Sequence, residues 1–254
     1  MDMNADWTVP NAMKLLEDTA AAVISALDTV KDWGPSGLRP TQYWSDVAAD
    51  AAALGVLDAA GVGVLSEESG LRRASSSLLV VVDPLDGSSN AERGLPWYAT
   101  SLCAMDATGP LAALVVNLAS GVRFSAIRGQ GAWRNGAPIS PTSCTTMGDA
   151  FVGLSGLPPH HLGWQQYRTY GAAALDLCAV ACGVLDAFID CSPSAHGVWD
   201  YLGGLLICQE AGAVVADGHH RELVVRDPLL RRTPVAAATA ELLEDILALR
   251  TSFP

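Results

Sequence analysis

An aliphatic run that ends abruptly in two aspartates constrains this chain more than any other feature of its sequence. Residues 78–82 read Leu-Leu-Val-Val-Val, and Asp83, Pro84, Leu85 and Asp86 follow them. A short aliphatic run bounded by turn-forming residues indicates a buried strand. Pro84 fixes a local φ and removes a backbone donor, so both carboxylates and the Leu85 carbonyl can converge on one hard cation.

The residues after the second aspartate have the features of an anion site. Gly87 permits a tight turn, and Ser88, Ser89 and Asn90 are residues favoured at helix N-termini. We expect a helix to begin here, with free N–H groups that attract phosphate. A divalent-cation site beside a phosphate site is typical of phosphoryl transfer. For an isolated pair of aspartates, the alternative is a turn in which the carboxylates only accept backbone N–H groups.

Further acidic residues weaken that alternative because they stand in similar contexts. Glu67 and Glu68 follow the apolar run 61–65 at another apparent strand end. Asp200 begins an apolar, glycine-rich helical segment, where its alternative role is to complement the helix dipole. Asp50 ends the helical sequence Ser-Asp-Val-Ala-Ala-Asp, where its alternative role is that of an exposed helical carboxylate.

Composition narrows the classes of protein and of partner. The chain has 254 residues and a formal net charge of −12, so its field repels nucleic acid. Its longest purely aliphatic run, residues 78–82, is far shorter than the roughly 20 residues that cross a bilayer. The cysteines form no CxxC pair, and the N-terminus lacks the pattern of a signal peptide. We expect a cytoplasmic protein with no nucleic-acid or membrane partner.

The order of periodic segments predicts two halves. In the first, residues 1–140, we expect helices over 7–32 and 46–59, followed by a largely antiparallel meander of strands at 78–82, 98–105, 112–118, 123–127 and 132–134. A Ser-, Thr- and Pro-rich stretch over 138–148 marks the boundary. In the second, residues 141–254, strands and helices alternate, with strands at 151–154, 187–190, 214–216, 223–225 and 234–237 and helices at 172–182, 199–210 and 241–249. Because neither half has a complete site, we expect the chemistry to lie between them.

Four segments in their order along the chain resemble one enzyme family. They are EESG from Glu67, DPLDGSSN from Asp83, GAAALDLCAVACGVLDAFID from Gly171 and WDYLGGLLICQEAG from Trp199. Together they resemble the inositol monophosphatase family of metal-dependent, lithium-sensitive phosphatases, which is related to fructose-1,6-bisphosphatase. The resemblance spans roughly residues 10–250. It implies an α+β or α/β fold, a layered αβαβα sandwich, and a homodimer.

The resemblance also implies a site and a mechanism. Two or three Mg²⁺ ions would be held by Glu67, Asp83, the Leu85 carbonyl, Asp86 and Asp200. Ser88, where the family usually has Thr, would orient a metal-activated water for in-line attack, supported by Asp50. The N–H groups of Gly87 and Ser88 would bind phosphate, whereas Asp86, Gly171, Ala173 and Asp190 would contact the rest of the substrate.

Two departures from the family pattern, and the distribution of basic residues, affect what the resemblance implies. Val47 replaces the usual Thr three residues before the Asp50-type acid, which removes a hydroxyl. The segment 191–198 is longer than in typical members and borders the alcohol half of the substrate; within it, His196 could touch a second phosphate, although surface or structural roles remain open for it. Few basic residues lie near the predicted pocket in the sequence, which weighs against a bisphosphate.

These observations favour a Mg²⁺-dependent phosphomonoesterase acting on a small polyol or sugar phosphate, with inositol 1-phosphate as the first candidate. Fructose 1,6-bisphosphate, histidinol phosphate, a 3′-phosphonucleotide and a pathway-specific sugar phosphate are the alternatives within the same chemistry. A catalytically silent regulator is the alternative from another class. A structural Ca²⁺ site is disfavoured, because the acids are scattered over both halves around an anion-binding helix end.

Overall fold

Two β-sheets and the helices packed on them organise the chain, which the computed structural model describes over residues 7–251 and 253. The first sheet has eight strands in the order β2-β1-β3-β4-β5-β6-β7-β8. Their bounds are β1 Gly63–Ser66, β2 Gly70–Arg72, β3 Leu79–Asp86, β4 Ala99–Asp106, β5 Gly109–Asn117, β6 Arg123–Ile127, β7 Gly131–Arg134 and β8 Ala137–Pro138. Only the β1–β3 pair is parallel, so the predicted meander is confirmed.

The two faces of this sheet carry different helices because alternate side chains of each strand point to opposite faces. Val80 and Val82 of β3 belong to the hydrophobic cluster formed with α1 (Val9–Leu27) and α2 (Trp44–Ala59). Val81 between them belongs to the cluster formed with α4 (Ala173–Ala181) and α5 (Val198–Ala211). Every residue of β3 is therefore buried, as its continuous aliphatic run predicts.

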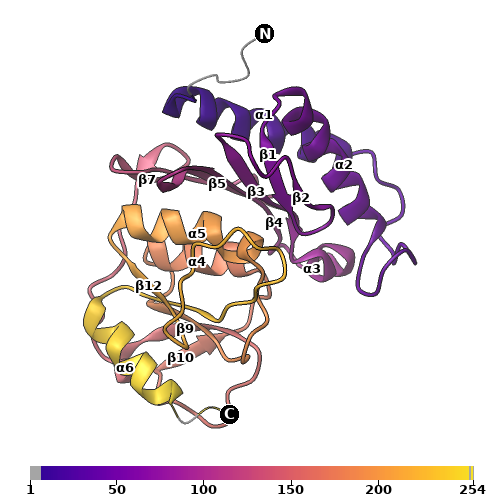
Figure 1. The fold of residues 1–254 in the computed structure, drawn as a ribbon. Coiled ribbons are helices and arrows are strands. Elements are labelled where there is room, and N and C mark those ends of the chain that lie inside the picture. Colours follow the sequence, from indigo (N-terminus) through magenta and orange to yellow (C-terminus); the bar gives the residue numbers. More distant parts are fainter. Residues whose placement is uncertain (1–6, 252, 254) are drawn as a thin grey trace.

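A second sheet lies beyond α4 and α5, with five strands in the order β10-β9-β11-β13-β12. These strands span β9 Phe151–Ser155, β10 Gln166–Arg168, β11 Ala187–Asp190, β12 Val214–Asp217 and β13 Pro234–Ala237. The last helix, α6 (Ala240–Arg250), packs on the outer side of this sheet, against a cluster that includes Leu242 and Ile246. Figure 1 shows the resulting layers: α1 and α2, the first sheet, α4 and α5, the second sheet, and α6. The layered αβαβα architecture is confirmed.

The division of the chain near residue 140 has a structural counterpart but stays a prediction as a domain boundary. All strands of the first sheet end by Pro138, and those of the second begin at Phe151, after a short 3₁₀ helix at Met147–Asp149. However, residues of α4 and α5 form one continuous hydrophobic cluster with strands of both sheets. The two halves therefore share a common interior.

Two predicted elements differ from the structure. The first helix ends at Leu27 rather than at residue 32, and residues 28–32 have no helical assignment. No strand forms over 223–225, because backbone groups there bond to side chains instead: the Leu223 carbonyl accepts the Tyr201 hydroxyl, and the Glu222 carbonyl accepts Arg232 Nε. Among the described residues, no helix combines the length and the apolar character needed to span a bilayer.

Candidate active site

The end of β3 brings its two aspartates together through a β-bulge. Asp83 pairs with Ser101 of β4 and Asp86 pairs with Ala99, so three steps along β3 match two along β4. Pro84 lies inside this bulge, where its missing N–H costs no ladder hydrogen bond. The Asp83 carboxylate accepts the Leu85 N–H at 3.0 Å, which fixes the side chain against its own turn. The convergence of Asp83 and Asp86 predicted from their spacing is therefore a property of the bulged strand.

The turn between β1 and β2 adds Glu67. Ser66 at the end of β1 donates its hydroxyl to Asp50 at 2.6 Å and accepts the Glu68 N–H at 3.1 Å. Ser69 on the other side of the turn also donates to Asp50, at 3.2 Å. Asp50 thus anchors both ends of the turn that carries Glu67.

Asp200 comes from the second half of the chain, at the first turn of α5. Its carboxylate accepts the Gly197 N–H at 2.7 Å, which closes the N-terminus of the helix. Carboxylate oxygens of Glu67, Asp83 and Asp200 lie within 4.8 Å of one another, and the charge of Asp86 acts on all three. We call these four residues, Glu67, Asp83, Asp86 and Asp200, the acidic cluster. The structure places three of the four carboxylates predicted to hold metal within 4.8 Å of one another, and the fourth, Asp86, ends the same bulged strand that carries Asp83.

The acidic cluster is electrostatically frustrated without a cation. Burial raises the pKa of Asp83 and Asp86 well above the ordinary aspartate value, and the neighbouring carboxylates raise each pKa further. Glu67 faces the open cavity, yet protein atoms surround it closely enough that burial and the charge of Asp200 raise its pKa to about 8. Four converging carboxylates in such a place match the oxygen ligands that Mg²⁺ prefers. The residues present therefore fit a divalent metal.

A short helix, α3 (Ser88–Arg93), begins directly beside the acidic cluster. Gly87 precedes it with a φ of +82°, and a Cβ at this position would approach the Trp97 carbonyl oxygen to 3.0 Å. Glycine is thus required both by the backbone conformation and by the close packing. Among the described residues, no hydrogen bond uses the N–H groups of Gly87 or Ser88, which leaves both free for a ligand.

The partner of Ser88 is Asp46 rather than Asp50. Asp46 is the aspartate of α2 that interacts with the Ser88 side chain, and its carboxylate accepts the Tyr43 N–H at 2.7 Å. Burial raises the pKa of Asp46 to about 6, despite the bond from Tyr43. The structure does not bring Asp50 to Ser88, because the two serines of the β1–β2 turn occupy its carboxylate. Asp46 and Asp50 lie one helical turn apart in α2, and this spacing explains why the sequence resemblance pointed to Asp50 instead of Asp46.

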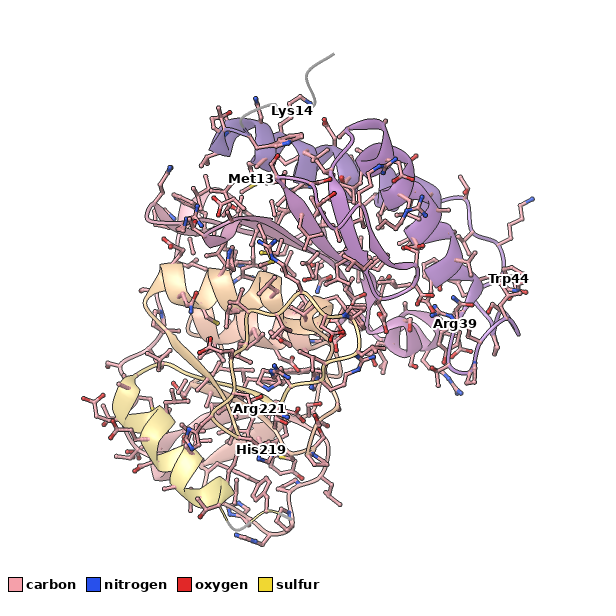
Figure 2. The ribbon with its side chains drawn as sticks, in the orientation of Figure 1. Met13, Lys14, Arg39, Trp44, His219 and Arg221 are labelled. Carbon is pink, nitrogen blue, oxygen red and sulfur yellow. The ribbon has the colours of Figure 1, made fainter. Side chains whose placement is uncertain are left out.

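A cavity of about 540 Å³ opens in front of Glu67, Ser88 and Asp46, and we call it the first cavity. Two arginines that sequence reasoning missed line it. Arg39, labelled in Figure 2, lies in the segment between α1 and α2 and forms an ion pair with Glu68. Arg231 stacks over the ring of Trp199, 5.0 Å from its centroid. The expected scarcity of basic residues near the pocket is therefore corrected, because the segments 34–43 and 226–233 bring two arginines to it.

A second cavity of about 280 Å³ lies on the other side of Asp86 and Asp200. Gly171 and Ala173, both predicted to contact substrate, line it, and Asp86 accepts the Ala174 N–H at 2.8 Å. Asp176 also lines this cavity; its carboxylate accepts Trp97 Nε1 at 2.9 Å, and burial raises its pKa to about 7. Asp176 lies in the first turn of α4, the helix that begins just after Gly171. An aspartate at this position is the sequence signal that could have identified it as a site residue.

Asp190, also predicted to contact substrate, is fully buried at the end of β11 and is not among the residues that line the second cavity. Its carboxylate bonds to His196, whose Nδ1 lies 2.8 Å from Asp190 Oδ2. His196 itself lines the second cavity. Burial lowers the pKa of His196, but the bond to Asp190 and the negative charge of Asp200 outweigh burial, so its pKa is raised.

Comparisons with known proteins agree with this geometry. The model of the inositol monophosphatase family matches residues 46–252. The fructose-1,6-bisphosphatase/inositol-1-monophosphatase of Methanothermobacter thermautotrophicus is 34% identical over 229 residues, which cover 80% of each chain. The fructose-1,6-bisphosphatase of Pyrococcus furiosus is 33% identical over 192 residues, which cover 74% of this chain and 75% of the relative.

The fold has a close counterpart among solved structures. A hypothetical protein from Pyrococcus horikoshii with similarities to inositol-1 monophosphatase superposes with a TM-score of 0.81 at 27% identity, covering 93% of this chain and 95% of its own. The bulged strand, the acidic cluster and the helix beside it define a metal-dependent class of phosphatase. The chain belongs to the inositol monophosphatase family, and it is a phosphoric monoester hydrolase.

Proposed function

We propose that this protein is a Mg²⁺-dependent phosphomonoesterase that hydrolyses a small polyol or sugar phosphate, with inositol 1-phosphate as the first candidate substrate. The observation that carries the proposal is the acidic cluster, in which the pKa of every carboxylate is raised because, among the described residues, no cationic side chain offsets burial and mutual repulsion. Mg²⁺ bound there would neutralise the charge of the phosphate and lower the pKa of a water molecule that attacks phosphorus.

The residues in and around the cluster would then have distinct roles in binding metal and phosphate. Glu67, Asp83, Asp86, Asp200 and the carbonyl of Leu85 are the candidate metal ligands. The free N–H groups of Gly87 and Ser88 would hold phosphate oxygens at the start of α3. Ser88 lines the first cavity and Asp86, directly before Gly87, lines the second, so a phosphate held here would lie against the cluster while the alcohol half extends into a cavity.

Ser88 and Asp46 are the pair that we assign to the attacking water. Asp46 interacts with the Ser88 side chain and both residues line the first cavity, so the Asp46 carboxylate would orient the serine hydroxyl there. An oriented hydroxyl can accept a proton of the water and so aim its lone pair at phosphorus. Asp50 acts indirectly, because it accepts hydrogen bonds from both sides of the turn that carries Glu67.

Fructose 1,6-bisphosphate is the second candidate, and a specific observation favours it. Arg39 and Arg231 line the first cavity, and guanidinium groups are suited to binding a second phosphate. The relatives from Methanothermobacter thermautotrophicus and Pyrococcus furiosus are both named for this activity. A substrate with one phosphate would leave these arginines to balance the charge of Glu68 and Asp200 alone.

Phosphate release from a panel of esters tests the proposal. The panel is inositol 1-phosphate, fructose 1,6-bisphosphate, histidinol phosphate and adenosine 3′,5′-bisphosphate, each with Mg²⁺, with chelator and with added Li⁺. We expect Mg²⁺-dependent, Li⁺-inhibited release from one of the first two. Release that is equally fast in chelator would overturn the metal assignment. The homodimer implied by the family resemblance is a separate prediction, which size-exclusion chromatography with light scattering checks.

A further inference from the structure

Both carboxylate oxygens of Asp190 are already engaged inside the protein. Oδ1 accepts the backbone N–H of Ser192 at 2.9 Å and its hydroxyl at 2.7 Å, and Oδ2 lies 2.8 Å from His196 Nδ1. The residue has no exposed surface. Asp190 is therefore not available to a substrate hydroxyl, and its negative charge is directed at the imidazole of His196.

The bond to Asp190 determines which nitrogen of His196 is available to a ligand. An ionised carboxylate only accepts hydrogen bonds, so Nδ1 must carry the proton. Nε2 is then the nitrogen left for a ligand: it accepts a hydrogen bond in the neutral ring and donates one in the charged ring, and a hydroxyl can pair with either form. Among the described residues Nε2 has no hydrogen-bond partner, and it is not one of the fully enclosed polar atoms without a partner. Because His196 lines the second cavity, its free nitrogen is open to that cavity.

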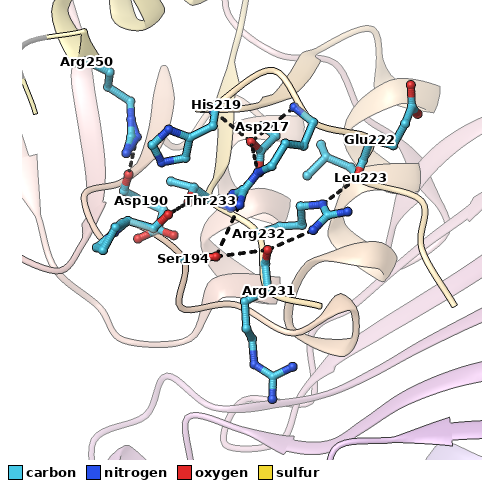
Figure 3. Close-up of polar contacts among 12 residues, drawn as sticks. Asp190, Ser194, Asp217, His219, Glu222, Leu223, Arg231, Arg232, Thr233 and Arg250 are labelled. Carbon is cyan, nitrogen blue, oxygen red and sulfur yellow. Dashed lines mark hydrogen bonds and ion pairs between the residues drawn. The ribbon is translucent and has the colours of Figure 1, made fainter. Parts of the chain in front are cut away.

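The loop that carries His196 is held in place from several directions. The main chain of His196 pairs with Arg232 through two backbone hydrogen bonds of 3.2 and 2.8 Å. Thr233 donates to the Pro193 carbonyl at 2.9 Å, Ser194 donates to the Arg231 carbonyl at 3.1 Å, and Arg250 donates to the Asp190 carbonyl at 2.9 Å (Figure 3). An imidazole on so constrained a segment is positioned before a ligand arrives, which lowers the entropic cost of binding.

Three other polar side chains of the second cavity are committed elsewhere. Asp86 accepts the Ala174 N–H, Asp200 accepts the Gly197 N–H, and Asp176 accepts Trp97 Nε1. Asp86 and Asp200 are also candidate metal ligands. Ser155 lines the cavity as well, with a hydroxyl that makes no hydrogen bond among the described residues. Of the two side chains with a free polar atom, His196 is the one that a buried carboxylate holds in place.

We propose that His196 is a specificity-determining residue whose Nε2 forms a hydrogen bond with a hydroxyl of the alcohol half of the substrate, and that Asp190 acts through it as a positioning residue. This inference rests on the proposed phosphatase function. It reassigns the contact that the family resemblance gives to Asp190, and it restricts the preferred substrates to esters with a hydroxyl within reach of the second cavity.

A pair of substitutions separates the two nitrogens of His196. His196→Asn retains a polar group near the Nδ1 position, facing Asp190, but removes the Nε2 side of the ring. His196→Gln places a polar group near the Nε2 position. The readout is the ratio of kcat/KM for two esters with Mg²⁺: the faster of inositol 1-phosphate and fructose 1,6-bisphosphate, and p-nitrophenyl phosphate, whose leaving group has no further hydroxyl.

We expect His196→Asn to lower kcat/KM for the hydroxylated ester by about 10-fold to 100-fold, mainly through KM, the size of one lost hydrogen bond. For p-nitrophenyl phosphate the change should stay below about threefold. His196→Gln should recover part of the loss. Asp190→Asn should shift the ratio in the same direction by a smaller factor, because it weakens the orientation of the ring without removing Nε2.

The outcomes distinguish this inference from the proposed function. If the wild type hydrolyses both esters and His196→Asn leaves their ratio unchanged, or reduces both rates equally, His196 does not read the substrate. If the Asn variant is too unstable to purify, an unchanged ratio in His196→Gln and in Asp190→Asn overturns the inference in the same way. If the wild type hydrolyses neither ester with Mg²⁺, the proposed function fails and the inference fails with it.

Discussion

Two groups of buried carboxylates in this molecule differ in where their counter-charge lies. The acidic cluster contains four carboxylates, no cationic side chain of the described residues forms a hydrogen bond with them, and the pKa of every member is raised. The second group is Asp217 with its partners. Asp217 is as buried as Asp83, but it accepts bonds from Arg221 at 2.8 Å, from the Thr233 N–H at 2.9 Å and from the His219 N–H at 2.8 Å. Burial raises its pKa, yet these bonds outweigh burial and the pKa is lowered.

This contrast separates a site built for an external cation from an internal structural network. Burial is common to both groups, so burial alone does not identify a functional acid. What differs is whether the chain supplies the partner. Arg221 and His219 lie in the second half of the molecule, away from the first cavity and Arg39 (Figure 2), so the network around Asp217 stabilises the fold there. Substitutions in the two groups should consequently affect different observables.

The largest expected effect is on catalysis. Asp83→Asn should lower kcat by at least about 1,000-fold, because it removes a carboxylate at the centre of the cluster and metal-assisted charge stabilisation contributes several kcal/mol. The measurement is phosphate release with Mg²⁺, accompanied by circular dichroism to show that the fold is intact. In chelator, the variant should unfold at a temperature at least as high as the wild type, since a repulsive buried charge is gone. A rate near that of the wild type would overturn the metal assignment.

The matched change in the second group should lower the stability of the fold and leave catalysis nearly unchanged. Asp217→Asn should lower the free energy of unfolding by about 2 kcal/mol, since it leaves Arg221 without its ionised partner, while kcat stays within about threefold. Arg221 is about one-third exposed, so the loss is smaller than for a fully buried pair. Urea denaturation at pH 7 measures it. A loss of activity as large as that of Asp83→Asn would remove the distinction between the two groups.

The two groups should also respond oppositely to pH. The lowered pKa of Asp217 contributes stability above the ordinary pKa of an aspartate, and this contribution is lost as pH falls through the folded-state value. The raised pKa values of the acidic cluster mean that the folded protein binds more protons, so without metal stability falls as pH rises toward the value of about 8 for Glu67.

Added Mg²⁺ should therefore stabilise the protein by about 2–3 kcal/mol at pH 8, at a concentration 100 times the dissociation constant that holds at this pH, and by less at pH 5.5. Thermal unfolding in Mg²⁺ and in chelator at the two pH values measures this difference. Asp217→Asn should keep the Mg²⁺ effect, and Asp83→Asn should lose most of it. An equal Mg²⁺ effect at both pH values in the wild type would count against proton–metal competition at the cluster.

The sequence indicated the first group far better than the second, for a physical reason. Asp83 and Asp86 lie three residues apart around Pro84 at the end of an aliphatic run, so local chain geometry alone is enough to make them converge. The elements that carry them were predictable for the same reason, because alternating or continuous apolar patterns reflect burial directly. The β1–β2 turn and Asp200 were also found, through their strand-end and helix-start contexts.

Long-range packing determines what the sequence did not show. Arg39 and Arg231 reach the first cavity only because two irregular segments, far apart along the chain, fold over it. The engagement of Asp190 with Ser192 and His196 depends on how the loop after β11 is tied to Arg232 and Thr233. In α2 the period of the helix places both Asp46 and Asp50 on the buried side, and only tertiary contacts decide which of them meets Ser88.

The smallest expected effects concern whether Asp46 or Asp50 acts with Ser88. Ser88→Thr should change kcat less than about threefold, because it retains the hydroxyl and adds one methyl group beside an open cavity. Ser88→Ala should lower kcat by about 10-fold to 100-fold through loss of the oriented hydroxyl. If Ser88 acts with Asp46, then Asp46→Asn should cost a similar factor, and the double variant with Ser88→Ala should cost little more than either alone.

Asp50→Asn is the control for this cycle. Its effect should add to that of Ser88→Ala, because it acts through the Ser66 and Ser69 hydroxyls on the turn that carries Glu67. Asp50→Asn should also change the Mg²⁺ concentration that gives half of the maximal rate, because weaker metal binding needs more Mg²⁺. Asp46→Asn should leave this concentration unchanged. Additive losses for Asp46 and non-additive losses for Asp50 would reverse the assignment and return Asp50 to the part that the family resemblance gives it.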